Sequence, residues 1–218
     1  MTTPIRGIIF DLDGVLLSTD EFHYRAWQEL ADREGIGFDR QINHRLRGVS
    51  RMTCLEILLE KSTRSYTDAE KSALADFKND RYRQLLGGLD SSAVSPAVWQ
   101  LLRDLRARGV ALAIGSSSRN TPLIMKLVGL TPLFDAVADG NDLTKTKPDP
   151  QVFLIAAERL GLPPAACLVV EDAPAGVEAG RRAGMRVLAI GPRTLHPDAE
   201  NLAATLDDIT VEDLLRCV

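Results

Sequence analysis

Short runs of apolar residues recur along the chain, and polar residues or glycine bound each run. Four of them lie at 7–10, 110–115, 167–170 and 186–190. Continuous apolar runs of this length are typical of strands that are buried on both faces of a sheet. Because segments with helical periodicity separate the runs, the pattern predicts an α/β fold built on a parallel sheet.

Helix-start signals open three of the separating segments. Proline follows serine or aspartate at 95–96 and at 149–150, and Pro174 begins a stretch that stops at Gly184. Proline is favoured in the first turn of a helix, whereas glycine is favoured just beyond the last turn. These signals predict that helices connect the strands, as a parallel sheet requires.

The interval 19–89 has a different pattern, with helical periodicity and no convincing strand. Ser18 and Thr67 each precede a glutamate by three residues, which is the spacing of a helix capping box. We therefore predict a helical cap at 19–89, inserted after the first strand of a core formed by 1–18 and 90–218. An insert at this point would lie over the carboxyl ends of the strands, where open α/β sheets bind ligands.

The composition argues against several classes of protein. The 218 residues carry a net charge of −4, which gives no general attraction to nucleic acid or to an anionic membrane. No apolar run approaches the ~18 residues of a membrane helix, and the run at 7–10 is too short for a signal peptide. The three cysteines are widely spaced and show no zinc-binding pattern. We expect a monomeric cytoplasmic protein without nucleic-acid or membrane partners.

Candidate chemistry begins directly after the first predicted strand. Asp11 and Asp13 stand there two residues apart, and Gly14 permits a tight turn beside them. Both carboxyl groups would face the crevice at the end of the strand. A pair of aspartates that stabilises a turn or caps a helix is the alternative reading.

Polar side chains also follow the second and third predicted strands. Ser116 follows the second, Glu171 and Asp172 follow the third, and Lys147 precedes a proline between them. A serine hydroxyl can hydrogen-bond a phosphate oxygen, a lysine can supply positive charge, and clustered carboxylates favour a hard cation such as Mg²⁺. Taken singly, each residue has a structural alternative, as a turn serine, a solvated lysine or a helix-capping aspartate.

Four ordered motifs carry a resemblance to a known family. They are Asp11-Leu12-Asp13-Gly14-Val15, Ser116, Lys147 and Glu171-Asp172. Together they resemble the motifs of the haloacid dehalogenase superfamily of phosphotransferases. The resemblance spans nearly the whole chain and implies a Rossmann-like core with an inserted α-helical cap. It also implies phosphoryl transfer through an aspartyl phosphate.

The same resemblance implies a role for each motif residue. Asp11 would be the nucleophile, and Asp13 the acid/base residue that protonates the leaving oxygen. Ser116 and Lys147 would offset the charge of the transferred phosphoryl group. The Mg²⁺ ligands would be Asp11, Asp13, Glu171 and Asp172.

Segments of the predicted cap resemble a narrower group, the β-phosphoglucomutases, at 18–27, 46–51 and 78–80. This likeness implies interconversion of β-D-glucose 1-phosphate and glucose 6-phosphate through β-glucose 1,6-bisphosphate. The residues expected to bind the phosphate that is not being transferred are Arg51, Ser118, Arg119 and Asn120. The cap residues expected near a small phosphorylated sugar are Thr19, His23, Arg47, Gly48, Ser50 and Lys78.

Departures from the mutase pattern keep other functions open. Asp139-Gly140-Asn141-Asp142 resembles a Gly-Asp-Asp loop of phosphatase relatives, so a sugar-phosphate or small-metabolite phosphatase is the alternative function. Ser18 and Ala173 stand where aspartate and serine are common in the mutases. A packing role for His23 and a solvated basic surface around Arg51 are structural alternatives. A non-catalytic interaction protein is the alternative of another class, but it predicts the loss of a charged motif residue, and all are present.

Overall fold

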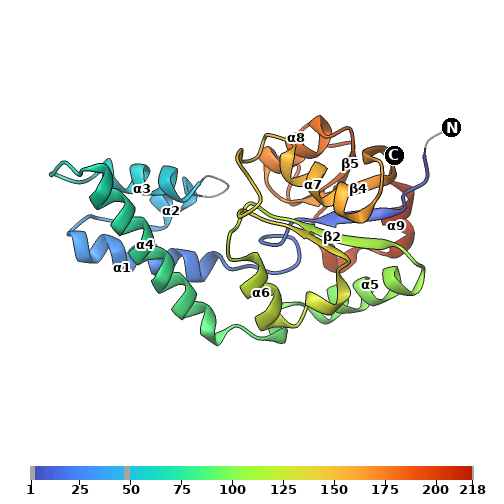
Figure 1. Ribbon diagram of the computed structural model, residues 1–218, viewed down its shortest axis with the longest axis horizontal. Helices are drawn as coiled ribbons and strands as arrows, with labels where there is room; N and C mark the ends of the chain where they lie inside the picture. Colours follow the sequence, from blue (N-terminus) through green and yellow to red (C-terminus); the bar gives the residue numbers. More distant parts are fainter. Residues whose placement is uncertain (1–2, 47–49, 218) are drawn as a thin grey trace. The chain divides into compact units, whose positions relative to one another are not determined.

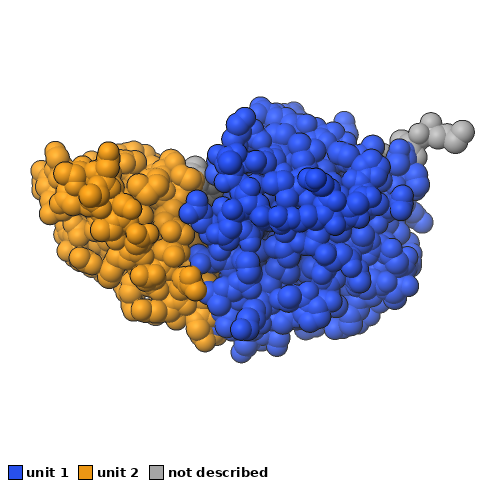
Figure 2. Space-filling view, in the orientation of Figure 1, with its two compact units in different colours: residues 1–18, 89–218 blue, residues 19–88 orange. Residues whose placement is uncertain are grey.

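The chain divides into two compact units in a computed structural model that describes residues 3–46 and 50–217. The larger unit comprises Met1–Ser18 with Leu89–Val218, and the smaller comprises Thr19–Gly88 (Figures 1 and 2). Leu89 is the one residue that the predicted boundaries assign differently. We call the larger unit the core unit and the smaller the cap unit.

A six-stranded sheet forms the centre of the core unit, with strand order β3-β2-β1-β4-β5-β6. All five pairings are parallel, which confirms the predicted sheet. The strands are β1 (Gly7–Phe10), β2 (Ala111–Gly115), β3 (Ala136–Ala138), β4 (Cys167–Glu171), β5 (Arg186–Ile190) and β6 (Asn201–Ala203). The four predicted strands are therefore present, and the two that were not predicted are short strands at the edges.

Helices cover both faces of this sheet. They are α5 (Pro96–Ala107), α6 (Thr121–Val128), α7 (Gln151–Leu160), α8 (Pro174–Arg182) and α9 (Val211–Arg216), with short 3₁₀ turns at Ser91–Ala93, Thr131–Leu133, Pro164–Ala166 and Leu206–Asp208. In Figure 1, α7 and α8 lie on one side of the sheet and α5 and α6 on the other. Ile9 and Val169 on central strands are fully buried in one cluster with Phe153 of α7 and Ala179 of α8. Burial from both sides explains why the central strands are continuously apolar.

The cap unit is helical, and none of its described residues forms a strand. Its helices are α1 (Asp20–Glu34), α2 (Arg40–His44), α3 (Arg51–Leu59) and α4 (Asp68–Leu85), followed by a 3₁₀ turn at Leu86–Gly88. The unit has its own hydrophobic core, in which Trp27 packs with Leu30, Leu55 and Leu74. Trp27 is only 2% exposed and is therefore a core residue of the cap unit.

The two predicted capping boxes have different outcomes. At α4 the Thr67 side chain accepts from the Glu70 backbone and the Glu70 carboxylate accepts from the Thr67 backbone, so this prediction is confirmed. The box predicted from Ser18 to Glu21 is wrong, because α1 begins at Asp20 and its N-cap is Thr19, without a capping side chain. Glu21 therefore lies at the second helical position, one residue too early to close a box.

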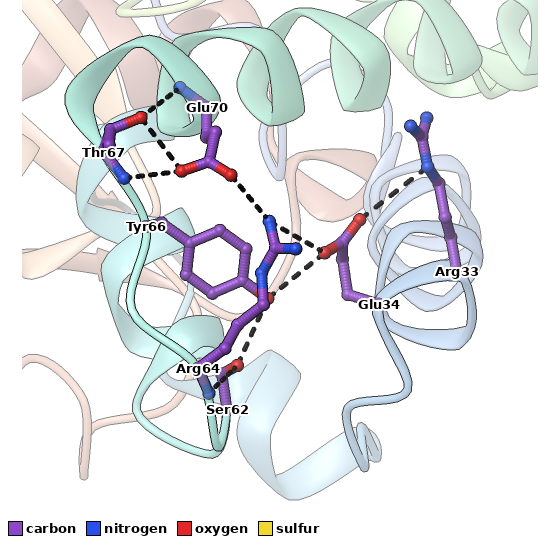
Figure 3. Close-up of polar contacts among 7 residues, drawn as sticks. All are labelled: Arg33, Glu34, Ser62, Arg64, Tyr66, Thr67 and Glu70. Atoms are coloured by element: carbon purple, nitrogen blue, oxygen red, sulfur yellow. Dashed lines mark hydrogen bonds and ion pairs between the residues drawn. The ribbon is translucent and has the colours of Figure 1, made fainter.

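A polar network connects the segment between α3 and α4 to helices α1 and α4 (Figure 3). Arg64 donates to Glu70 at 3.1 Å and lies 3.9 Å from the carboxylate of Glu34 at the end of α1. The Tyr66 hydroxyl donates to the same Glu34 carboxylate at 3.2 Å. Glu70 thus serves the capping box and the network together, so the start of α4 helps to fix this end of the cap unit.

We expect Thr67→Ala to lower the free energy of unfolding of the cap unit by about 1 kcal/mol, because the N-cap hydroxyl and part of the Glu70 contact are lost together. Urea unfolding followed by circular dichroism measures the change. Ser72→Ala, at an exposed position of the same helix, is the control and should leave stability unchanged or slightly raised. Equal effects of the two substitutions would contradict the role of the box.

Candidate active site

The predicted catalytic residues of the core unit lie at the carboxyl ends of three neighbouring strands, β2, β1 and β4. Asp11 directly follows β1, Ser116 directly follows β2, and Glu171 ends β4 with Asp172 next in the chain. The strands are parallel, so these ends share one edge of the sheet, which is where such folds bind ligands. Asp11, Ser116 and Glu171 are all buried.

Lys147 joins the three strand ends through a single ammonium group. Its Nζ donates to Asp11 Oδ1 at 2.5 Å, to Glu171 Oε1 at 2.6 Å and to the Gly115 carbonyl at 3.0 Å. The same nitrogen lies 4.8 Å from the centre of the Phe153 ring. The solvated-lysine alternative is therefore wrong, because the side chain is only 7% exposed and all these partners are internal.

Burial and crowding shift the ionisation of this cluster. Burial acts to lower the pKa of Lys147, but the charges of Asp11 and Glu171 outweigh it and raise that pKa above its usual value. Burial raises the pKa of Glu171, although the charge and hydrogen bond of Lys147 oppose the rise. Burial, reinforced by Glu171 and Asp11, raises the pKa of Asp172 to about 7. The site therefore holds more carboxyl groups than its ammonium can neutralise.

Two glycines allow the loops to close around these carboxyl groups. Gly14 has a φ of 86°, and a Cβ there would lie 2.1 Å from Asp172 Oδ2. A Cβ at Gly176 would lie 1.8 Å from Glu171 Oε1. The predicted tight turn is confirmed, since the Gly14 amide donates to the Leu17 carbonyl at 2.7 Å. This turn brings the loop of Asp13, which is half-buried, against Asp172.

The carboxyl groups are suited in kind to a divalent metal ion. Within residues 3–46 and 50–217, no three acidic, histidine or cysteine side chains already form an arrangement that holds one. The donors are nevertheless all oxygen atoms, as Mg²⁺ prefers. Burial raises the pKa of Asp172 most, and the charges of Glu171 and Asp11, which a cation would offset, raise it further. The donor set therefore fits a hard cation such as Mg²⁺. Asp172 is not the N-cap of α8, which is Ala173, so the capping alternative is wrong.

The segment 116–120, which we call the serine loop, runs from the end of β2 to the start of α6. The Ser116 hydroxyl accepts from the Ser118 amide at 3.2 Å, and the Ser118 hydroxyl accepts from the Asn120 amide at 3.2 Å. Thr121 Oγ1 donates to the Ser118 carbonyl at 2.8 Å. Ser116 therefore stabilises a turn, which is the structural role that the sequence also allowed for it. That role uses one lone pair of the Ser116 hydroxyl, and it leaves the other lone pair and the proton able to make further hydrogen bonds.

Four of the six predicted cap residues lie within the described part of the chain. Two of these, the buried Lys78 and the half-buried His23, form a pair. Lys78 is 3% exposed, and its Nζ lies 2.7 Å from His23 Nδ1. Lysine has only donors, so Nδ1 accepts and His23 is neutral. Burial, followed by the charges of Lys78 and Arg51, lowers the pKa of His23 well below its usual value. His23 also stacks on Tyr82 with 4.0 Å between ring centres, so it has a packing role as well.

The other cap residues surround this pair or support α3. Thr19 accepts a hydrogen bond from the Tyr82 hydroxyl at 2.9 Å, and Arg51 donates to Asn79 at 2.8 Å. Ser50 is the N-cap of α3. Arg47 and Gly48 lie outside the described residues. Tyr82 was not predicted, although its position one helical turn after Lys78 on α4 is a signal that could have indicated it.

The fold and these strand-end residues define a phosphoryl-transfer enzyme, and the comparisons agree. Residues 5–184 match the haloacid dehalogenase-like hydrolase family, and the chain belongs to this family. A β-phosphoglucomutase of Bacillus subtilis (strain 168) is 38% identical over 210 residues, covering 95% of this chain and 93% of the relative. The fructose-1-phosphate phosphatase YqaB of Escherichia coli (strain K12) is 34% identical over 179 residues, covering 82% and 93%.

A solved structure supports the same placement. The crystal structure of a β-phosphoglucomutase from Clostridium difficile superposes with a TM-score of 0.88 at 33% identity, covering 95% of this chain and 94% of that one. The similarity therefore extends through the cap unit as well as the core unit. Separately, none of the helices in the described part of the chain is both long enough and apolar enough to cross a membrane.

We expect Lys147→Met, in metal-free buffer, to lower the free energy of unfolding by about 3–5 kcal/mol at pH 8, because it leaves two carboxylates buried without their counter-ion. The deficit should shrink toward about pH 4. Glu171 has a raised pKa in the folded protein, so its protonation contributes stability at low pH that is lost as the pH rises through that pKa.

Chemical unfolding across a pH series measures this dependence. Lys126→Met, at an exposed position on α6, is the matched control and should change stability little at any pH. A deficit for Lys147→Met that is the same at pH 4 and pH 8 would show that the lysine does not act through the charges of these carboxylates.

Proposed function

We propose that this enzyme interconverts β-D-glucose 1-phosphate and glucose 6-phosphate through β-glucose 1,6-bisphosphate. The observation that carries the proposal is the polar cluster of the cap unit, around the buried Lys78 and the half-buried His23, in a chain that resembles β-phosphoglucomutases over nearly its whole length. A monophosphatase needs one strong phosphate site, whereas a bisphosphate mutase needs two. The cap cluster supplies charge for a second.

The core unit supplies the groups for phosphoryl transfer. Asp11 is the nucleophile that forms an aspartyl phosphate, and the 2.5 Å contact with Lys147 holds one of its oxygens in place so that the other can attack. Asp13 protonates the leaving oxygen and later removes a proton from the attacking hydroxyl. Ser116 and Lys147 offset the charge of the phosphoryl oxygens.

The metal site of this proposal consists of Asp11, the backbone carbonyl of Asp13, Asp172 and Glu171. Mg²⁺ bound there would neutralise charge between the carboxylates and the phosphoryl group. The support is the excess of buried carboxyl groups over the single ammonium of Lys147.

The cap unit is proposed to hold the phosphate that is not being transferred. Arg51 is oriented by Asn79 and carries a guanidinium that can bind phosphate through two hydrogen bonds. Lys78 and Arg51 both bring positive charge to the surroundings of His23, and positive charge favours an anionic sugar phosphate. Excluding water while this ligand is bound favours transfer to sugar over hydrolysis.

A sugar-phosphate phosphatase is the second candidate, and two observations favour it. The Escherichia coli relative is a fructose-1-phosphate phosphatase, and the Asp139-Gly140-Asn141-Asp142 loop resembles that of phosphatases. Both functions pass through the same aspartyl phosphate and differ in whether a sugar hydroxyl or water accepts the phosphoryl group.

We also propose that the enzyme acts as a monomer in the cytoplasm. A reducing compartment is supported by its cysteines, since Cys54, Cys167 and Cys217 are all free thiols and buried. Gel filtration with light scattering tests the monomeric state.

Asp11→Asn should abolish turnover while leaving the fold intact, because an amide is not an anionic nucleophile. The assay contains Mg²⁺, β-D-glucose 1-phosphate and a bisphosphate primer, and it follows glucose 6-phosphate and free phosphate together. In the parent enzyme the ratio of these products distinguishes mutase from phosphatase. Asp104→Asn, on exposed α5 surface, is the control. Near-parental turnover by Asp11→Asn would exclude the covalent mechanism.

Arg51→Ala should damage mutase flux selectively. Loss of a desolvated, charge-assisted phosphate contact costs about 2–5 kcal/mol, which reduces productive bisphosphate binding by more than about tenfold. Hydrolysis of a small monophosphate should change little. Arg45→Ala removes another cap arginine, one that pairs with Glu60 at 2.8 Å, and is the matched control. If both activities of Arg51→Ala fall by the same factor, Arg51 does not bind the second phosphate.

A further inference from the structure

The segment 139–142, which we call the support loop, lies against the serine loop. It follows β3, the strand at the edge of the sheet next to β2. The Gly140 amide donates to the Ser118 carbonyl at 3.2 Å. Arg119 is contacted twice, since its Nε donates to the Gly140 carbonyl at 3.3 Å and its own carbonyl accepts from Asn141 Nδ2 at 3.2 Å. Two of these hydrogen bonds are accepted by backbone carbonyls of the serine loop, and the third is donated by the Arg119 side chain. The support loop therefore constrains the backbone of the serine loop as well as one of its side chains.

The support loop is itself held in one conformation. Asp139 is 6% exposed, and its Oδ1 accepts from the Asn141 amide at 2.7 Å and from Asn141 Nδ2 at 2.8 Å. Asp142 Oδ2 accepts from the Asp139 amide at 3.0 Å. Asn141 Nδ2 thus divides its two protons between Asp139 and the carbonyl of Arg119, which fixes the amide orientation.

Arg159 of α7 binds the support loop to β3 at the edge of the sheet, and we call its contacts the Arg159 clasp. Its guanidinium forms a two-pronged ion pair with Asp142, at 2.8 Å and 2.6 Å, and also donates to the Val137 carbonyl of β3. The planar fork of arginine suits such a bidentate contact. The clasp therefore connects α7 and β3 to the support loop, and the support loop connects them to the serine loop.

Close packing leaves no freedom at the point of contact. A Cβ at Gly140 would lie 2.4 Å from the Ser117 carbonyl oxygen and 2.9 Å from the Arg119 amide nitrogen. Both atoms belong to the backbone, so a larger residue would force the serine loop to move. The glycine is thus required for the approach of the two loops.

We propose that Asn141 and Gly140 are positioning residues that set the backbone of the serine loop for phosphate binding, with Arg159 as the anchor of their loop. The proposal rests on the proposed function, because it assigns the serine loop to a phosphate group. Hydrogen bonds to phosphate weaken steeply outside a narrow distance range, and a displacement of about 1 Å at a reacting centre costs up to about 100-fold in rate.

The first experiment measures inorganic phosphate binding by calorimetry in the presence of Mg²⁺, together with kcat, KM and Tm. Asn141→Ala should raise the Kd for phosphate by about tenfold or more while Tm changes little, because buried core packing is unaffected. Gly140→Ala should raise the Kd at least as much and also lower Tm, because its Cβ would meet backbone atoms of the serine loop. Gly37→Ala is the matched glycine control, since a Cβ there would meet nothing within 4 Å. It should leave Kd, KM and Tm at parental values.

The second experiment separates the clasp from a general effect of losing an ion pair. Arg159→Met should weaken phosphate binding in the same direction as Asn141→Ala. Arg106→Met is the control, because Arg106 pairs with Asp135, which precedes β3 at its opposite end, and both pairs are similarly exposed. It should lower Tm about as much as Arg159→Met and leave the Kd for phosphate unchanged.

The outcomes are distinguishable. Parental phosphate affinity in Asn141→Ala and Gly140→Ala, or equal weakening by the Gly37 and Arg106 controls, overturns the positioning role and leaves the proposed function standing. A parent enzyme that neither binds phosphate nor forms an aspartyl phosphate overturns the proposed function and the positioning role together.

Discussion

The ammonium group of Lys147 is the interaction on which the core site depends. It joins a carboxylate after β1, a carbonyl at the end of β2 and a carboxylate at the end of β4, all within 3.0 Å. Two buried carboxylates on neighbouring strands would otherwise repel each other, and the lysine would be costly to bury alone. Each charge is therefore tolerated only because the others are present, and Asp11 and its counter-charge are fixed as one unit.

This arrangement also explains why the loops around the site need glycine. Asp172 lies against Gly14 and Glu171 lies against Gly176, each at a distance that excludes a Cβ. The two glycines thus let the backbone approach both carboxylates closely. These surroundings have an electrostatic consequence, because burial and like charge raise the pKa of Asp172 to about 7. A site of this kind favours a cation, and an anionic substrate would approach it more readily once the excess charge is offset.

The sequence predicted the parts of the fold in which one physical signal dominates. The four central strands are buried on both faces, and their continuous apolar runs were sufficient to locate them. Strands β3 and β6 are three residues long and lie at the edges, where no such run is required. The capping box predicted from Ser18 to Glu21 is absent although its spacing is right, because the helix begins at Asp20. Spacing alone cannot specify which residue becomes the N-cap.

The places of the candidate site residues on the sheet could be predicted from the sequence, but their contacts could not. The motifs placed Asp11, Ser116 and Glu171 at strand ends, because a strand end follows from the apolar run before it. That Lys147 would contact three strand ends depends on the path of a loop far away in sequence, which local pattern does not encode. The same holds for Asn141, whose role depends on a contact with Arg119 across two loops.

The distinction between mutase and phosphatase resides in the cap unit, because the core chemistry is common to both. An aspartyl phosphate reacts with whichever hydroxyl is held in line with it, so the acceptor is chosen by binding and by exclusion of water. Lys78 is buried beside a neutral imidazole and between the rings of Trp27 and Tyr82, each 4.8 Å from its nitrogen. Holding a charge in such surroundings is costly, and a surface role would not require it. The lone pair of the imidazole and the faces of the two rings offset part of that cost, so Lys78 of α4 is held to α1 through His23 and Trp27.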